Sequence, residues 1–137
     1  MAKRTARRGD IHACAMALPE VTQGEGWGGR PTYAVRGKNF VVFREPRKDA
    51  VDEETGERLE DVVMFLTPSQ EDKEALLQSG APWFTTPHFD GYDAVLLRER
   101  DISRVSRAEL EEVIRDAWLR RAPKRLAQEW LAQRGPS

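Results

Sequence analysis

The chain has 137 residues, of which 39% are hydrophobic and 33% are charged, and its formal net charge at neutral pH is −1. This length and composition fit one soluble globular domain and exclude a predominantly disordered chain. A charge so close to zero does not predict general attraction to nucleic acid, so any charge-based function must come from a local cluster. No apolar run reaches the ~18 residues of a membrane span, and the basic start lacks a secretory apolar core, so we expect a cytoplasmic protein.

The first elements are a basic arm and a short helix. Residues 1–9 lack apolar periodicity and are predicted to form a flexible arm, which leaves residues 10–137 as a single domain. Asp10 can cap a helix in which Ile11, Cys14, Ala15 and Leu18 follow helical spacing until Pro19. Cys14, the only cysteine, then faces the core, which favours a structural thiol over a nucleophile and excludes an intrachain disulfide.

Two strands and a long polar connection follow. Residues 32–35 and 40–44 read as a hairpin around a turn at 36–39, preceded by a glycine-bearing turn. The acidic segment Asp49–Asp61 lacks the ligand spacing of a calcium-binding loop, and we expect a solvated edge loop. The apolar run at residues 62–66 predicts the next strand.

A helix and a second hairpin are predicted next. Thr67-Pro68-Ser69-Gln70 has the pattern of a capping box, and the helix should run to about Ser79, with Gly80 as its terminating residue. The stretch WFTTPHFDGYDAVLL, residues 83–97, places Asp90-Gly91 between two strand-like runs. This pair is a strong signal for a two-residue hairpin turn.

The C-terminal region predicts two helices. Ser106 to Glu109 is a second capping box, and it leads into the best amphipathic pattern of the chain, formed by Leu110, Val113, Ile114, Ala117 and Trp118. After Pro123 a last helix can place Leu126, Trp130 and Leu131 on one side. The whole order predicts one α+β domain, an antiparallel sheet with helices packed on one face.

Two groups of residues could bind a ligand. His88 and Asp90 would share one strand face, as a metal pair or an acid–base pair does, but no third ligand or nucleophile signature accompanies them. We therefore expect no metal, no cofactor and no enzymatic activity. The aromatic residues around both hairpins could form a core or a ligand surface, and the surface would comprise Trp27, Trp83, His88, Asp90 and Tyr92.

A basic cluster straddles the end of the long predicted helix. Positive charge there stabilises the helix dipole, and it can also contact phosphates. The cluster consists of Arg115, Arg120, Arg121, Lys124 and Arg125.

Three stretches in this order carry a family resemblance: ALPEVTQGEGWGGRPTYAVRGKNF, FTTPHFDGYDAVLL and DAWLRRAPKRL. Together, over residues 10–126, they resemble the MmcQ/YjbR family. The resemblance implies a compact α+β fold with an antiparallel sheet, compared with the double-wing domain and the frataxin-like (CyaY-like) sandwich. DNA binding is the family's usual label, and no catalytic residue or cofactor comes with it.

Two functional hypotheses result. The leading one is a non-enzymatic DNA-binding protein that contacts phosphates through the basic cluster, with Arg30, Arg36 and Lys38 as contacts from the first hairpin. The alternative is a small-molecule or protein-interaction module that uses the aromatic surface around Trp27 and residues 83–92. If the acidic segment overhung the sheet face, it would repel phosphate there.

Overall fold

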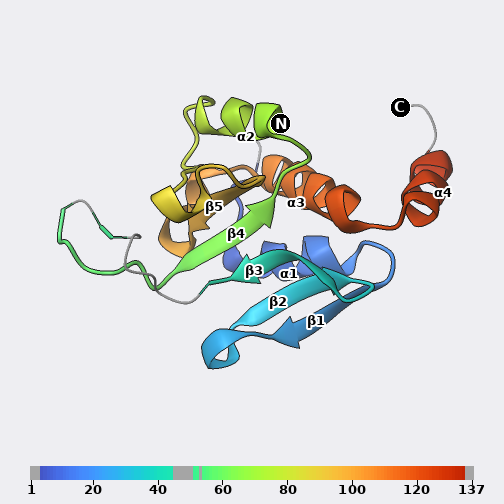
Figure 1. Ribbon diagram of the computed structural model, residues 1–137, viewed down its shortest axis with the longest axis horizontal. Helices are drawn as coiled ribbons and strands as arrows, with labels where there is room; N and C mark the ends of the chain where they lie inside the picture. Colours follow the sequence, from blue (N-terminus) through green and yellow to red (C-terminus); the bar gives the residue numbers. More distant parts are fainter. Residues whose placement is uncertain (1–3, 45–50, 53, 135–137) are drawn as a thin grey trace.

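One antiparallel sheet organises the molecule (Figure 1). The computed structural model describes residues 4–44, 51–52 and 54–134. Five strands pair in chain order: β1 (Val21–Glu25), β2 (Pro31–Val35), β3 (Lys38–Phe43), β4 (Val62–Leu66) and β5 (Ala94–Arg98). The predicted α+β class with a single antiparallel sheet is confirmed.

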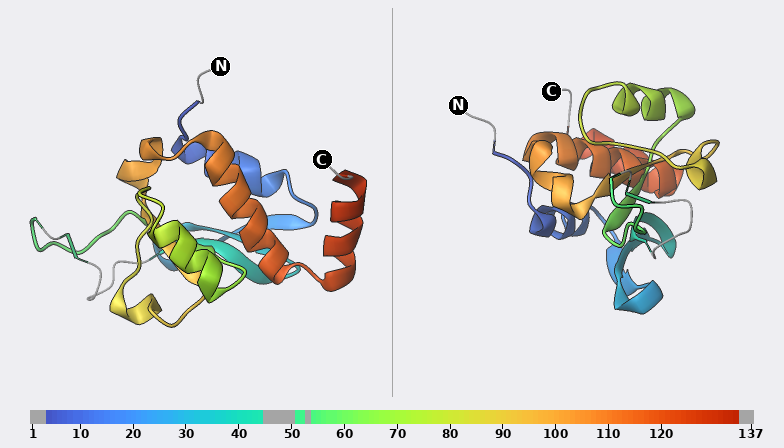
Figure 2. Two further views of the ribbon diagram at one scale, coloured as in Figure 1. Left: turned by 90° about the horizontal axis from the view of Figure 1, so that it is seen from above. Right: turned by 90° about the vertical axis from the view of Figure 1, so that its left-hand side faces the viewer.

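Two helices cover one face of the sheet. α1 (Arg8–Met16) and α3 (Arg107–Arg121) contact each other and lie behind the strands in Figure 1. α2 (Gln70–Leu77) lies beside β5, and α4 (Lys124–Arg134) stands at the end of α3 (Figures 1 and 2). The opposite face of β1, β2 and β3 therefore carries no helix among the described residues.

The core lies between the sheet and these two helices. All five residues of the predicted apolar face of α3 are buried, from Leu110 to Trp118. The indole Nε1 of Trp118 donates to the carbonyl of Pro19 at 3.1 Å, so the ring is packed and its polar atom is satisfied. Trp130 of α4 packs against Trp118 with ring centroids 5.2 Å apart and ring planes inclined at 58°, and this contact holds α4 to the body.

Both predicted helices form with a serine cap, but neither predicted capping box is complete. Ser106 caps α3 by accepting from the Glu109 backbone N–H at 3.1 Å, but the Glu109 carboxylate accepts from the indole of Trp83 at 3.3 Å instead of returning to the cap. In α2 the cap is Ser69, which accepts from the Asp72 N–H at 3.2 Å, and not Thr67. The buried Thr67 side chain donates to the Ser69 carbonyl, which moves the helix start two residues along.

The predicted N-terminal arm is wrong for residues 4–9. Arg4 and Ala6 exchange backbone hydrogen bonds with Arg107 and Val105 at 2.9 and 2.8 Å, and residues 8–9 already belong to α1. Residues 1–3 lie outside the described part of the chain. Asp10 is consequently the third residue of α1 instead of its cap, and it accepts from the Arg7 N–H at 2.8 Å.

The first hairpin is confirmed, and an additional strand precedes it. β2 and β3 join through Arg36 and Gly37, both with positive φ, as a tight two-residue turn requires. The last two residues of β1, Gly24 and Glu25, were predicted to belong to a glycine-bearing turn, and residues 21–23 were assigned to no element. A Cβ at Gly24 would lie 3.0 Å from the hydroxyl of Thr32, so the glycine permits close pairing of β1 with β2.

The second predicted hairpin does not form. Residues 94–98 pair with β4, and across the expected turn only Phe84 bridges to Leu96. Residues 87–89 form a 3-10 turn, so His88 and Asp90 do not share a strand face. We call residues 81–93, which run along the outer side of β5, the connecting segment.

Asp10 makes the fold sensitive to acid. Its carboxylate accepts two hydrogen bonds from Arg4, at 2.8 and 3.0 Å, and lies 3.5 Å from Arg107. These contacts, with that of Arg4 foremost, lower the Asp10 pKa from 3.8 to about 2. Because the unfolded chain takes up this proton more readily, the stabilisation is present above about pH 4 and is lost as the pH falls to about 2.

We therefore expect Asp10→Asn to flatten the pH dependence of the unfolding free energy between about pH 4 and 2, as measured by urea denaturation. Glu57→Gln, which changes an exposed loop carboxylate, is the matched control and should leave the dependence unchanged. An Asp10→Asn variant with the wild-type acid profile would contradict this role.

Candidate functional site

Lys73 positions the connecting segment. This side chain of α2 is 1% exposed, and its Nζ donates to the backbone carbonyls of Phe89, Asp90 and Tyr92, the last at 2.8 Å. Burial lowers the Lys73 pKa, opposed by the nearby charges of Asp90 and Asp93. The ammonium therefore replaces the strand pairing that this segment lacks and fixes where its aromatic side chains lie.

A hollow of about 560 Å³ opens on the sheet beside this segment. Val42 and Met64, register partners on β3 and β4, lie at its floor, and Val42 is only half-buried, whereas its neighbours Val41 and Phe43 are buried. Because strand residues alternate between faces, the hollow lies on the face opposite α1 and α3. We call it the sheet-face hollow, and it is lined by Lys38, Asn39, Val42, Arg44, Met64, Phe89, Tyr92 and Arg121.

Three cations reach the sheet-face hollow from different elements. Lys38 begins β3, Arg44 follows it, and Arg121 is the last residue of α3. Lys38 and Arg44 are six positions apart, about 20 Å along an extended strand. Positive charge is thus spread along the length of the hollow.

Aromatic side chains form one wall of the sheet-face hollow. The guanidinium of Arg44 lies 5.0 Å from the ring centre of Phe89, in a cation–π contact. The hydroxyl of Tyr92 accepts from Arg121 Nη2 at 3.3 Å, and Tyr92 is 43% exposed. Phe89 belongs to the predicted aromatic surface of residues 83–92, whereas Arg44 was not predicted as a site residue, because only the fold brings the end of β3 to the connecting segment.

Most of the predicted basic cluster is paired with carboxylates. Arg120 contacts Asp93 at 3.2 Å, Arg125 contacts Glu129 at 3.2 Å, and Arg115 lies 4.0 Å from Glu112. Lys124 is exposed, and Arg121 faces the sheet-face hollow. Exposed ion pairs of this kind contribute at most about 1 kcal/mol, so a phosphate can compete for the arginines.

The three phosphate contacts predicted on the first hairpin lie in different parts of the structure. Lys38 joins Arg121 at the sheet-face hollow, so the structure brings these two predicted groups together. Arg36 pairs with Glu20 at 2.6 Å, outside the hollow. Arg30 donates to the Glu60 carbonyl at 3.3 Å, at the far end of the sheet from the turn between β2 and β3 (Figure 1).

A comparison of the sequence with known protein families assigns the chain to one of them. The pattern of the YjbR family matches residues 16–120. The chain belongs to the YjbR family. The resemblance to MmcQ/YjbR proteins is therefore confirmed, and the sheet-face hollow is built from matched residues together with Arg121, which directly follows them.

The individual proteins that the chain resembles have no stated function. Uncharacterised proteins of Mycobacterium bovis and of two strains of Mycobacterium tuberculosis are 53% identical over 53 residues. This match spans 39% of the chain and only 39% of the length of each relative. No solved structure is significantly similar to the chain.

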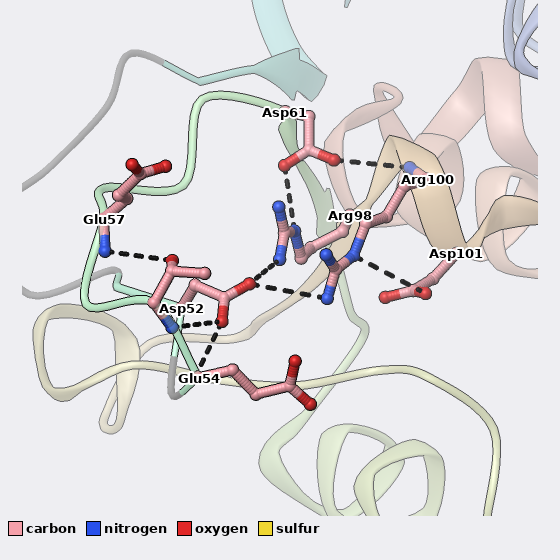
Figure 3. Close-up of polar contacts among 8 residues, drawn as sticks. Asp52, Glu54, Glu57, Asp61, Arg98, Arg100 and Asp101 are labelled. Carbon is pink, nitrogen blue, oxygen red and sulfur yellow. Dashed lines mark hydrogen bonds and ion pairs between the residues drawn. The ribbon is translucent and has the colours of Figure 1, made fainter.

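In this YjbR-family chain, Asp52 and Asp61 of the acidic segment pair with Arg98 at the end of β5. Figure 3 shows Arg98 between two carboxylates, with Nη1 2.8 Å from Asp52 and Nε 2.9 Å from Asp61. The hydrogen bond from Arg98, aided by backbone N–H groups of Glu54 and Thr55, lowers the Asp52 pKa. None of the described residues of the segment lines the sheet-face hollow, and its residues 49, 50 and 53 lie outside the described part of the chain.

The aromatic surface of the alternative hypothesis is only partly present. Trp83 is 4% exposed and packs edge-on against Phe65, so it is a core residue. Tyr92 and Asp90 are exposed, and Asp90 lies 3.5 Å from the Thr85 hydroxyl. The side chains of Trp27 and His88 lie outside the described part of the structure.

Other chemical groups lie apart from the sheet-face hollow. Cys14 is 5% exposed, and burial raises its pKa, which disfavours the thiolate that a nucleophile needs. The His12 ring bonds the Tyr33 hydroxyl at 3.0 Å. Across the described ranges, no three His, Cys, Asp or Glu residues group as metal ligands, and no helix there has the length and apolar character to cross a membrane.

Replacing Lys73 tests its anchoring role. Lys73→Met keeps the apolar stem but leaves three carbonyls without their donor, so we expect the unfolding free energy to fall by about 1–3 kcal/mol. Urea denaturation measures this change, and amide exchange should be faster in residues 84–93. Lys124→Met, at an exposed lysine, is the control, and a similarly small effect of both substitutions would exclude the anchor.

Proposed function

We propose that this YjbR-family protein is a non-enzymatic nucleic-acid-binding protein, and that DNA phosphates bind at the sheet-face hollow. The observation that carries the proposal is the convergence of Lys38, Arg44 and Arg121 on one open hollow. These cations come from two ends of β3 and from the end of α3, so the fold concentrates positive charge that a chain of net charge −1 lacks globally.

The surrounding charges support this assignment. Lys38 and Lys124 have no ion pair among the described residues, so they can neutralise phosphate without first losing a carboxylate. Arg120 is held by Asp93 in a half-exposed pair, and a phosphate would share it. The described part of the acidic segment lies at the opposite end of the sheet from the start of β3 (Figure 1), and there Arg98 compensates Asp52 and Asp61.

A second candidate function uses the same hollow for a small anionic molecule. The observation in its favour is the exposed ring of Tyr92 beside Arg121, since a planar anion would satisfy both groups. Calorimetric titration with mononucleotides and with other aromatic phosphates distinguishes this candidate. Tight binding of a small molecule, with none of a polynucleotide, would favour it.

The proposed function predicts salt-dependent binding. We expect the anisotropy of a labelled mixed-sequence DNA to report an affinity that falls steeply between about 50 and 200 mM salt, because bound phosphates release counterions. Lys38→Gln combined with Arg121→Gln should weaken binding and reduce the log–log salt slope by about 1 for each lost contact.

The matched control removes two exposed arginines away from the hollow, as Arg58→Gln combined with Arg104→Gln. This variant has the same net charge as the test variant, so it separates a local contact from a general charge effect. Equal weakening in both variants, or an affinity independent of salt, would contradict phosphate binding at the sheet-face hollow.

A further inference from the structure

We propose that the sheet-face hollow takes a single strand of nucleic acid, with one base stacked on Tyr92 and the flanking phosphates on the cations beside it. This inference rests on the proposed function and specifies its substrate. A purely electrostatic site needs only positive charge. This hollow also presents an exposed aromatic ring beside an apolar floor of Val42 and Met64.

The Tyr92 ring is held in place before any ligand binds. Its carbonyl accepts from Lys73 Nζ at 2.8 Å and its hydroxyl from Arg121 at 3.3 Å, while the Phe89 ring supports it at a centroid distance of 6.0 Å. The ring nevertheless remains 43% exposed. A fixed aromatic side chain loses little conformational entropy when a base stacks on it, so this geometry favours stacking.

The arrangement of cations matches an extended backbone. Arg121 and Lys38 lie at the Tyr92 end of the hollow, and Arg44 lies at the end of β3, beyond Phe89. Single-strand-binding grooves combine these two features, a cationic track for the backbone and aromatic platforms for the bases. Three phosphate contacts predict a log–log salt slope of about −2 for a single strand.

Duplex DNA does not meet the aromatic part of this site. Base faces inside a duplex are covered by their neighbours, so none can lie on Tyr92 without being flipped out of the stack. The longest described helix, α3, carries Glu111 and Glu112 among its exposed residues, and these carboxylates oppose its approach to a groove lined by phosphates. The available surface is therefore the concave one.

The experiment uses the full chain and three labelled probes of about 12 nucleotides, the size range that single-strand sites cover. The probes are single-stranded DNA, single-stranded RNA of the same sequence, and duplex DNA. We expect both single strands to bind at least tenfold more tightly than the duplex. Tighter binding of the DNA strand would identify DNA as the natural ligand, and tighter binding of the RNA strand would identify RNA. Either result supports a single-strand site.

Substitution of Tyr92 separates stacking from charge. Tyr92→Leu should weaken single-strand binding about tenfold without changing the salt slope, because the ring is lost and the cations remain. Tyr92→Phe keeps the ring and should retain most of the affinity. Leu131→Ala, which truncates another exposed apolar side chain, is the control and should have no effect.

A fluorescence measurement on the wild-type protein tests stacking independently of whether Tyr92→Leu alters the fold. A 2-aminopurine base in the DNA strand should lose fluorescence on binding to the wild-type protein, as a stacked base does. Equal affinity for duplex and single strands, with no quenching and no effect of Tyr92→Leu, would overturn the single-strand inference and leave phosphate binding intact. Failure of all three probes to bind at the lowest salt would overturn the proposed function itself.

Discussion

The buried ammonium of Lys73 is the interaction on which the ligand-facing half of the molecule depends. The connecting segment has one bridge to β5 and a 3-10 turn, and three of its carbonyls converge on this one side chain. A buried charge is costly unless its hydrogen bonds are satisfied, so the segment and α2 stabilise each other. The hydrogen bonds from the Lys73 ammonium fix the backbone carbonyls of Phe89 and Tyr92, and this backbone position places both rings at the hollow.

Ion pairs compensate the described carboxylates at one end of the sheet, and cations line the hollow on its open face. Arg98, at the end of β5, lies between two carboxylates of the acidic segment and holds Asp52 and Asp61 at that end of the sheet. At the opposite end, the first residue of β3 and the last residue of α3 both line the sheet-face hollow with positive groups. A chain of near-zero net charge thereby presents a local cationic surface, which attracts an approaching anion.

Local signals in the sequence were sufficient for the elements that depend on local contacts. The apolar face of α3, the cap at Ser106 and the tight turn between β2 and β3 all follow from residues within a few positions of one another. The Asp90-Gly91 signal failed because β5 pairs with β4, a long-range choice that no local pattern contains. β1 was missed because Gly24 is typical of a turn. Its role in the strand depends on Thr32 of the neighbouring strand, whose hydroxyl leaves no room for a Cβ at this position.

The two edges of the sheet differ in their capacity to associate with other chains. At β5, Phe84 occupies backbone groups of Leu96 and α2 lies alongside, so that edge is closed. β1 has no outer partner among the described residues, yet it is short and mostly polar, and it contains Gly24, all features that oppose strand addition. A substitution that made β1 longer and more apolar would therefore convert this edge into the molecule's principal route to aggregation.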